Sequence, residues 1–427
     1  MSFGRFVRDA NAAGRLVVQP RMGFQSPHHM REGLLATRSA AATTVGTITL
    51  DSYTRVGDHD AARLAVEKSL ELNGYPLVAH TAEVTRSVLD GVQDAAFPVQ
   101  VRHGSASPQR ILAALAPVGL NASEGGPISY CLPYGRLPIG KSVENWTEGC
   151  RLLVAGAPPS DEPHLETFGG CMLGQLCPPS LLVALSVLEG LFFRQHGLHS
   201  ISLSYAQQTN AEQDTEAVGA LRRLAAERLP GIDWHVVIYA YMGLFPQTEH
   251  GAAALLRAAA CLAVRTRSER LMVKTSAEAF RIPTIDENVT ALERAAHAAS
   301  AAPAADPQRV DTGIYDEARG LVEAVLELTD DVGRALVSAF RLGILDVPYC
   351  LHPDNAGRSR AYIDDKGWLR WSETGRMPIT ADGGGRHPLR AADLLDALGY
   401  IRHTFDRQAP EPTPLAERDG GHDGRSN

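Results

Sequence analysis

Short apolar runs recur along the chain and alternate with longer stretches of helical periodicity, which is the pattern of a parallel βα architecture. Eight runs are predicted to be strands: Leu16–Gln19, Val45–Leu50, Pro76–His80, Pro98–Arg102, Gly119–Ser123, Ser200–Ser204, His235–Tyr241 and Arg270–Lys274. Eight strands alternating with helices are what a closed (β/α)8 barrel of the TIM type requires. We therefore predict an α/β protein with such a barrel, and an open, doubly wound sheet is the alternative.

Between the strands, helical patterns are predicted over Asp60–Leu72, Pro108–Leu115, Ser180–His196, Asp214–Arg228 and Glu249–Val264. The composition then shifts in an alanine-rich stretch over 295–305, where Pro303 and Pro307 favour a break. We expect residues 1–300 to form the barrel and residues 301–406 a smaller α+β elaboration.

The C-terminal elaboration is expected to contain two helices and a hairpin. The helices cover Ile314–Leu342 and Leu389–Phe405, and the hairpin covers Ala361–Ser372 with a turn at Asp365-Lys366-Gly367. Residues 407–427 lack apolar periodicity and are expected to be disordered.

Composition excludes several classes of function. The chain has 41 Lys and Arg against 49 Asp and Glu, and a net charge of −8 argues against binding nucleic acid. Its longest apolar stretch, Leu181–Phe193, is too short to span a bilayer, so a cytoplasmic protein is expected. The six cysteines include no C-x-x-C pair and the 15 histidines no H-E-x-x-H, so we expect no metal held by this chain.

Basic residues follow several predicted strands at the ends where a barrel enzyme places its reactive groups. Arg21 follows the first strand, Arg55 the second, and Arg102 with His103 ends the fourth. Three arginines at one barrel mouth are costly unless an anionic ligand compensates them, and each guanidinium can grip a carboxylate with two hydrogen bonds. The trio indicates a dicarboxylate or phosphorylated substrate, whereas surface ion pairs are the alternative for each arginine.

The segment 121–134, NASEGGPISYCLPY, is the most unusual in the chain. Glu124 precedes two glycines that let the backbone approach a ligand, and Tyr130 and Tyr134 follow. Glu124 is a candidate to accept a substrate proton or hold an ammonium, and a glycine-rich turn with a solvated glutamate is the alternative. Lys274 and Glu278, one helical turn apart, could bracket a hydroxylated ligand or form a salt bridge.

A series of ordered motifs allows a family to be named. They are QPRMG at 19–23, LDSYTR at 50–55, NGYP at 73–76, VRHG at 101–104, SEGGPISYCLPY at 123–134, KSVENW at 141–146, ETFGG at 166–170, CPPS at 177–180, YMGLFPQ at 241–247, VKTSAEAFRIPT at 273–284 and DNAG at 354–357. From about Leu16 to about Phe405 the chain closely resembles the epsilon subunits of glutamate mutase, also called methylaspartate mutase. The resemblance implies a (β/α)8 barrel with a C-terminal elaboration.

The same resemblance implies an isomerase that interconverts L-glutamate and threo-3-methyl-L-aspartate with adenosylcobalamin. The cofactor supplies the radical chemistry, and the protein positions and encloses the substrate. The resemblance assigns Arg21, Arg55 and Arg102 to the cluster that clasps the two substrate carboxylates, and Glu124 to the substrate amino group. His103, Tyr130 and Tyr134 are placed with the substrate-binding residues. Lys274 and Glu278 are assigned to the adenosyl ribose, and Gly23 and Asn73 to the surroundings of the adenosyl group.

Two features concern partners and specificity. The cobalamin-binding signature D-x-H-x-x-G is absent, and in this family it lies on a separate small sigma subunit. We therefore expect such a partner, with a homodimer of this chain inside a heterotetramer. Tyr239 and Ala240 stand where the family pattern has the more polar His and Gln. A related mutase with a shifted amino-acid substrate, or a non-catalytic barrel binding an acidic metabolite, are the alternative functions; retention of the arginines and Glu124 argues against the second.

Overall fold

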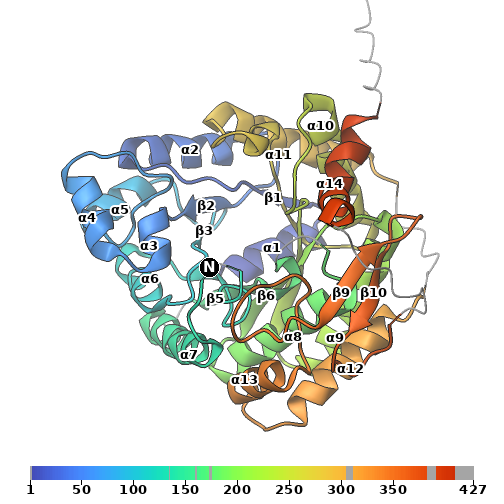
Figure 1. Ribbon diagram of the computed structural model, residues 1–427. Helices are drawn as coiled ribbons and strands as arrows, with labels where there is room; N and C mark the ends of the chain where they lie inside the picture. The colour runs from blue at the N-terminus through green and yellow to red at the C-terminus, as the bar shows by residue number, and fades with distance from the viewer. Residues whose placement is uncertain are drawn as a thin grey trace, which may run out of the picture.

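The computed structural model describes residues 2–133, 135–158, 161–172, 176–303, 311–381 and 391–408. Its centre is a parallel sheet in the order β1-β8-β7-β6-β5-β4-β3-β2, with helices around it (Figure 1). The strands are β1 (Val17–Gln19), β2 (Gly46–Thr49), β3 (Val99–Arg102), β4 (Ala122–Gly125), β5 (His164–Thr167), β6 (Ser200–Ala206), β7 (Asp233–Tyr239) and β8 (Arg270–Met272). The edge strands β1 and β2 meet through a bridge between Val18 and Thr44, which nearly closes the ring and confirms a (β/α)8 barrel.

The helices that cover the barrel lie between successive strands, except α11, which follows the last strand, β8. They are α2 (Pro27–Ser39), α3 (Ser52–Val56), α4 (His59–Glu67), α5 (Ala82–Leu89), α6 (Gln109–Ala113), α7 (Ile139–Gly156), α8 (Pro179–Gln195), α9 (Ala211–Arg228), α10 (Glu249–Arg265) and α11 (Ile285–Ala301). Side chains of Ser, Thr, Asn or Asp cap several of them, as Asn210 does for α9 and Thr248 for α10.

Helix α8 explains the longest apolar run of the sequence. One side of α8 packs against β5 and β6, and two C-terminal helices, α12 (Ile314–Leu326) and α13 (Val332–Leu342), pack on the other. Nearly every residue of α8 is therefore buried, which is what an all-round apolar helix requires. No helix in the described ranges is long and apolar enough to cross a membrane.

The strand predictions were right in number and wrong at two places. Pro76–His80 is a turn, in which the Ala79 and His80 amides donate to the Pro76 carbonyl over 3.0 and 3.1 Å. The strand that replaces it in the count is β5, whose sequence HLET contains a single aliphatic residue, Leu165. The segment has only four residues and one aliphatic side chain, so it lacks the apolar run by which the other strands were predicted, although all four residues are buried.

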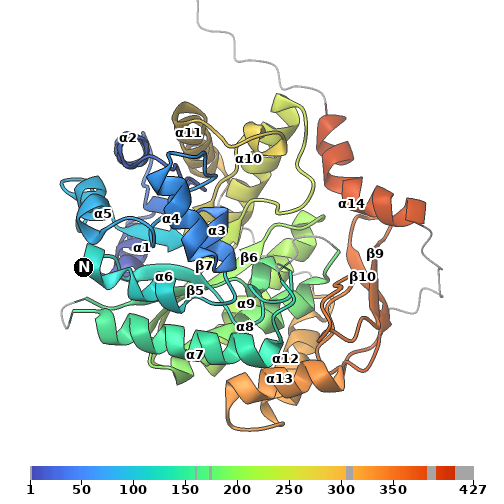
Figure 2. The same cartoon turned by 60° about the vertical axis from the view of Figure 1, so that its left-hand side comes forward.

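The C-terminal elements gather on one side of the barrel, as Figures 1 and 2 show. The predicted hairpin is confirmed as β9 (Ser359–Ile363) and β10 (Leu369–Thr374), with Gly367 at a φ of +80° in its turn. The single helix predicted over Ile314–Leu342 is instead α12 and α13, because Asp331 caps a new helix by accepting from the Arg334 amide over 2.7 Å.

The last helix, α14 (Ala391–Asp406), agrees with the predicted segment. The prediction of a disordered tail falls almost wholly on residues outside the described ranges. The boundary between a barrel ending at residue 300 and a C-terminal elaboration stays a prediction.

Helix α1 (Phe3–Ala12) lies against the amino ends of the strands. The Phe3 ring is 5.1 Å from the ring of His164 and 5.0 Å from the Arg270 guanidinium, and those residues begin β5 and β8. A Cβ atom on Gly4 would lie 2.4 Å from Oγ of Ser200, which begins β6. Helix α1 therefore covers the amino-terminal end of the barrel.

Candidate active site

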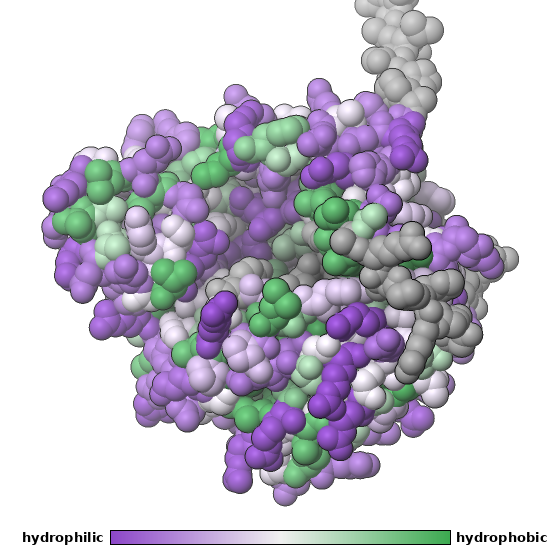
Figure 3. All heavy atoms as spheres, in the orientation of Figure 1, coloured by the Kyte–Doolittle hydropathy of each residue, from purple (hydrophilic) through white to green (hydrophobic). Residues whose placement is uncertain are grey.

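The predicted site residues meet at the carboxyl end of the barrel. Arg102 is the last residue of β3, and Glu124 lies in β4. Arg21 and Lys274 each follow a strand by two residues, and Arg55 lies in α3 just after β2. In the orientation of Figure 1, the space-filling view has a hollow near the centre of the ring, with hydrophilic residues inside it (Figure 3).

Glu124 is the centre of the site. Its side chain is buried, with 1% of its surface exposed. Arg102 Nε donates to Glu124 Oε2 over 2.7 Å, the Tyr239 hydroxyl donates to the same oxygen over 2.8 Å, and the Tyr130 hydroxyl donates to Oε1. The alternative of a glutamate solvated in a glycine-rich turn is therefore wrong, because burial and these donors fix the carboxylate.

A second buried carboxylate, Glu166 in β5, lies beside Glu124 as its register partner on the neighbouring strand. The Tyr239 hydroxyl contacts Glu166 Oε1 as well as Glu124, so it links the two carboxylates. Arg270 in β8 donates to Glu166 Oε2 and is fully buried with it. Gln19 and Gln100 extend this network by accepting from the Arg270 guanidinium.

Neither Glu166 nor Arg270 was identified as a site residue from the sequence. The available signal was the motif ETFGG at 166–170, which was used for the family resemblance but not for a strand. Because the sequence pattern does not predict a strand over 164–167, it gives no reason to expect Glu166 inside the barrel.

The arginines differ in their environment. Arg102 is buried in its pair with Glu124, so the alternative of a surface ion pair is wrong for it. Arg21 Nη1 donates to Glu278 Oε2 over 2.9 Å, but Arg21 Nε is buried and has no hydrogen-bond partner among the described residues. Arg55 Nε is likewise buried without a described partner. Buried donors without acceptors are costly, which favours an anionic ligand between these side chains.

Lys274 lies beside the arginines with 8% of its surface exposed. Burial lowers the pKa of Lys274 to about 8, and the nearby Glu278 carboxylate opposes this shift. Lys274 Nζ is 4.0 Å from Glu278 Oε2, which is beyond hydrogen-bond distance, and 5.0 Å from the centre of the Phe245 ring. The two side chains therefore form a loose ion pair that leaves the ammonium free to donate to a hydroxyl group.

His103 forms part of the wall. Burial, together with the positive charges of the neighbouring Arg102 and Arg55, lowers the pKa of His103 to about 3, so the imidazole is neutral. Its Nδ1 accepts from the Ser105 amide over 3.0 Å, and its ring stacks at 5.8 Å on Trp146. Contact of His103 with substrate stays a prediction.

The two glycines after Glu124 are required by close packing. Gly125 has a φ of +133°, and a Cβ atom there would lie 2.4 Å from the Trp146 ring. The loop that follows brings Tyr130 back to Glu124, where the Tyr130 ring also packs 5.0 Å from Phe168. Tyr134, predicted to line the same pocket, lies outside the described residues.

The two residues assigned to the adenosyl group both have structural roles. A Cβ atom on Gly23 would lie 2.2 Å from the Thr49 carbonyl oxygen, so only glycine lets this loop pass beside β2. Asn73 Oδ1 accepts from the Ser52 amide at the start of α3 over 3.0 Å. Their contact with a cofactor stays a prediction.

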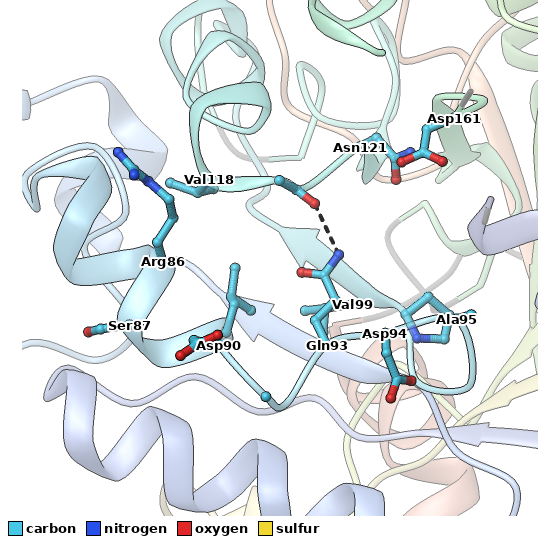
Figure 4. Close-up of a pocket in the computed structure, with 14 residues that line it drawn as sticks. Arg86, Ser87, Asp90, Gln93, Asp94, Ala95, Val99, Val118, Asn121 and Asp161 are labelled. Carbon is cyan, nitrogen blue, oxygen red and sulfur yellow. Dashed lines mark hydrogen bonds between the residues drawn. The ribbon is translucent and has the colours of Figure 1, made fainter. Parts of the chain in front are cut away.

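A separate cleft of about 640 Å³ lies at the other end of the barrel. It is lined by residues just before β3 and β4, among them Pro98 and Asn121, and by Arg86 and Asp90 near the end of α5. Figure 4 shows the hydrogen bond from Gln93 Nε2 to the Gly119 carbonyl, which is 3.0 Å long, at this cleft. None of the predicted site residues lines it.

All six cysteines are free thiols, and five of them are buried. Within the described part of the chain, no group of three His, Cys, Asp or Glu side chains has an arrangement that could hold a metal ion.

Comparisons with known proteins agree with this geometry. The model of the methylaspartate mutase E chain family matches residues 1–390. The glutamate mutase epsilon subunit of Yersinia enterocolitica is 31% identical over 400 residues, which cover 89% of this chain and 82% of that protein. The epsilon subunit of Halobacterium salinarum is 30% identical over 92% of this chain and 85% of its own length. That of Escherichia coli is 29% identical over 87% of this chain and 80% of its own length. The chain belongs to the methylaspartate mutase E chain family.

Proposed function

We propose that this chain is the catalytic component of an adenosylcobalamin-dependent mutase that interconverts L-glutamate and threo-3-methyl-L-aspartate. The family assignment supports the reaction. The observation that carries the proposal is the buried Glu124 carboxylate beside Arg102, with two further arginines at the same barrel end. This arrangement matches a small amino dicarboxylic acid, whose carboxylates need cations and whose ammonium needs an anion.

The charges at the mouth support a dianionic binding site. Four cationic side chains face two carboxylates there: Arg21, Arg55, Arg102 and Lys274 against Glu124 and Glu278. The excess of two positive charges suits the two carboxylates of the substrate. The unpartnered Nε atoms of Arg21 and Arg55 are donors that these carboxylates would satisfy.

Glu124 is proposed to act on the substrate amino group. Enclosed and partly desolvated, its carboxylate is a strong hydrogen-bond acceptor and a candidate proton acceptor. Tyr130, Tyr239 and Arg102 hold the carboxylate in one orientation by donating to it. The side chain therefore meets the substrate without a reorganisation of its own.

The residues at the mouth also fit the cofactor. Lys274 and Glu278 would hold the adenosyl ribose, since a buried ammonium and a carboxylate 4.0 Å apart offer a donor and an acceptor to its hydroxyl groups. When bound, adenosylcobalamin supplies the radical chemistry. The cobalt ligand is expected on a small sigma subunit with the signature D-x-H-x-x-G, in a heterotetramer that contains two copies of this chain.

A surface for that subunit is available around the barrel mouth. Segments that follow β2, β7 and β8 carry exposed apolar side chains: Val56, Leu244, Phe280 and Ile282, of which Val56 is 75% and Phe280 67% exposed. Exposed apolar residues that ring a polar site are typical of a docking surface.

The first prediction concerns the proposed need for a separate sigma subunit that supplies the cobalt ligand. The purified chain alone should show no mutase activity and should lose adenosylcobalamin on dialysis, and adding the sigma subunit should restore turnover. The measurement is the cobalamin absorbance retained after dialysis, together with methylaspartate formation from glutamate. A stoichiometric pink complex of the chain alone with full turnover would refute the two-component proposal.

The second prediction is that Arg102→Lys lowers kcat/KM although the charge is retained. Lysine lacks the planar fork, so it cannot donate to Glu124 and to a substrate carboxylate in the geometry of arginine. The loss should be about 1.5–3 kcal/mol, which is typical of a charge-assisted hydrogen bond. Arg151→Lys, at an exposed pair with Glu148 on α7, is the matched control and should keep full activity. An unchanged kcat/KM for Arg102→Lys would place Arg102 outside the substrate site.

A further inference from the structure

A third buried carboxylate, Glu189 in the outer helix α8, is not used by the proposed reaction. Its side chain is fully buried, and no cation among the described residues forms a salt bridge with it. Instead, five donors surround it. Ile128 N and Ser129 N donate to Oε1 over 3.2 and 2.9 Å, and Ser129 Oγ, Phe168 N and Gly169 N donate to Oε2 over 3.0, 3.2 and 2.8 Å.

These donors belong to two loops that are far apart in the sequence. Ile128 and Ser129 lie in the loop after β4, whereas Phe168 and Gly169 lie in the loop after β5. One carboxylate therefore ties together the loops of two neighbouring strands at the carboxyl end of the barrel. Backbone amides that converge on one anion form a nest, in which each donor would be unsatisfied if the anion were removed.

The loop after β4 is shaped around this carboxylate. A Cβ atom on Gly126 would lie 2.0 Å from Glu189 Oε1, so the backbone passes directly over the carboxylate only because residue 126 is glycine. The first glycine after Glu124 packs on Trp146, and the second packs on Glu189.

Both loops carry side chains that contact the reactive centre. Tyr130 follows Ser129 directly, and its hydroxyl donates to Glu124. The Phe168 ring lies 5.0 Å from the Tyr130 ring and 5.5 Å from the Tyr239 ring, so it packs against both phenols that hold Glu124.

We propose that Glu189 is a positioning residue that fixes the loops after β4 and β5 and thereby places Tyr130 and Phe168 around Glu124. Its effect on turnover rests on the proposed function, whereas its effect on the two loops does not. Burial raises the pKa of Glu189 to about 7, and the surrounding amide and hydroxyl donors oppose that shift.

The test is Glu189→Gln, which keeps the shape but turns one acceptor oxygen into a donor that faces other donors. In the chain alone, hydrogen exchange of the Ile128, Ser129, Phe168 and Gly169 amides should accelerate at least tenfold. In the enzyme assembled with its sigma subunit and adenosylcobalamin, kcat should fall at least tenfold. Glu189→Asp keeps the charge and should recover part of both effects.

The matched control is Asp214→Asn. Asp214 in α9 is also buried, also has its pKa raised to about 7 by burial, and accepts from the Tyr205 hydroxyl and the Gln208 amide. It holds the loop after β6, which bears none of the predicted site residues. Asp214→Asn should lower the melting temperature while kcat of the folded enzyme stays unchanged.

A double-mutant cycle tests whether Glu189 acts through Tyr130. Tyr130→Phe should reduce kcat less in the Glu189→Gln background than in the parent, because the tyrosine is already misplaced there. Faster exchange with an unchanged kcat, or unchanged exchange, would overturn the proposal. If Glu189→Gln does not fold, the same measurements on Glu189→Asp decide. A parent enzyme without mutase activity, combined with faster loop exchange in the variant, would contradict the proposed function and leave the loop assignment intact.

Discussion

Glu124→Gln should lower kcat by a factor of about 10² to 10⁴ with little change in KM, the range typical of a lost general base. The substitution keeps the shape of the side chain and removes its charge and basicity. Three donors converge on this carboxylate, so the amide NH₂ group would face at least one of them. The variant should therefore also be less stable, since a donor of Arg102 or a tyrosine loses its acceptor.

Measuring kcat and the melting temperature on the same preparation separates the two effects. Glu124→Asp keeps the charge but shortens the reach, so it should recover only part of kcat. A Glu124→Gln enzyme that melts earlier yet turns over at the parental rate would show that Glu124 only supports the loop.

The second large effect concerns stability. Arg270→Leu should reduce the free energy of unfolding by about 3–5 kcal/mol, because it leaves the fully buried Glu166 carboxylate without its cation. Ser202 Oγ at 3.1 Å and Gln100 Nε2 at 3.3 Å would remain as donors to Glu166, but neither carries a charge. Urea unfolding followed by circular dichroism measures the loss.

Two controls define this effect. Arg281→Leu removes one partner of an exposed pair and should leave the free energy of unfolding nearly unchanged. Adding Glu166→Gln to Arg270→Leu removes the isolated charge and should restore part of the stability. An Arg270→Leu variant as stable as the Arg281→Leu control would show that the buried pair does not support the barrel.

Seven of the eight strands were predicted from short runs in the sequence, although the run Gly119–Ser123 overlaps β4, Ala122–Gly125, in only two residues. The missing strand, His164–Thr167, places His and Glu inside the barrel, where ion pairing replaces apolar packing. Pro76–His80 was mistaken for a strand because its residues are as apolar as a strand's, yet Pro76 accepts the hydrogen bonds of a turn. The polarity pattern of a sequence shows that a residue such as Glu166 is charged, but it does not show that a distant residue, here Arg270, pairs with that charge inside the barrel.

Site residues were easier to predict the closer they lie to the end of a strand. Arg102 and Glu124 end or lie in strands, so the barrel alone brings them to one place. Tyr239 was noticed only as a departure from the family pattern, although it connects Glu124 with Glu166. Glu189 was visible only as an interruption of an apolar helix, because its donors come from loops whose path no local pattern specifies.

Helix α1 has a consequence for how fast substrate enters and product leaves. This helix packs Phe3 and Gly4 against the first residues of the strands, and the fully buried Glu166–Arg270 pair fills the barrel interior. Substrate and product must therefore enter and leave at the carboxyl end of the strands. That opening is also the surface on which the proposed sigma subunit would dock. Ligand release and subunit contact would then compete for the same passage, and an assembled enzyme would retain its substrate longer than the chain does alone. Residence time would thus be set by how often the two components separate.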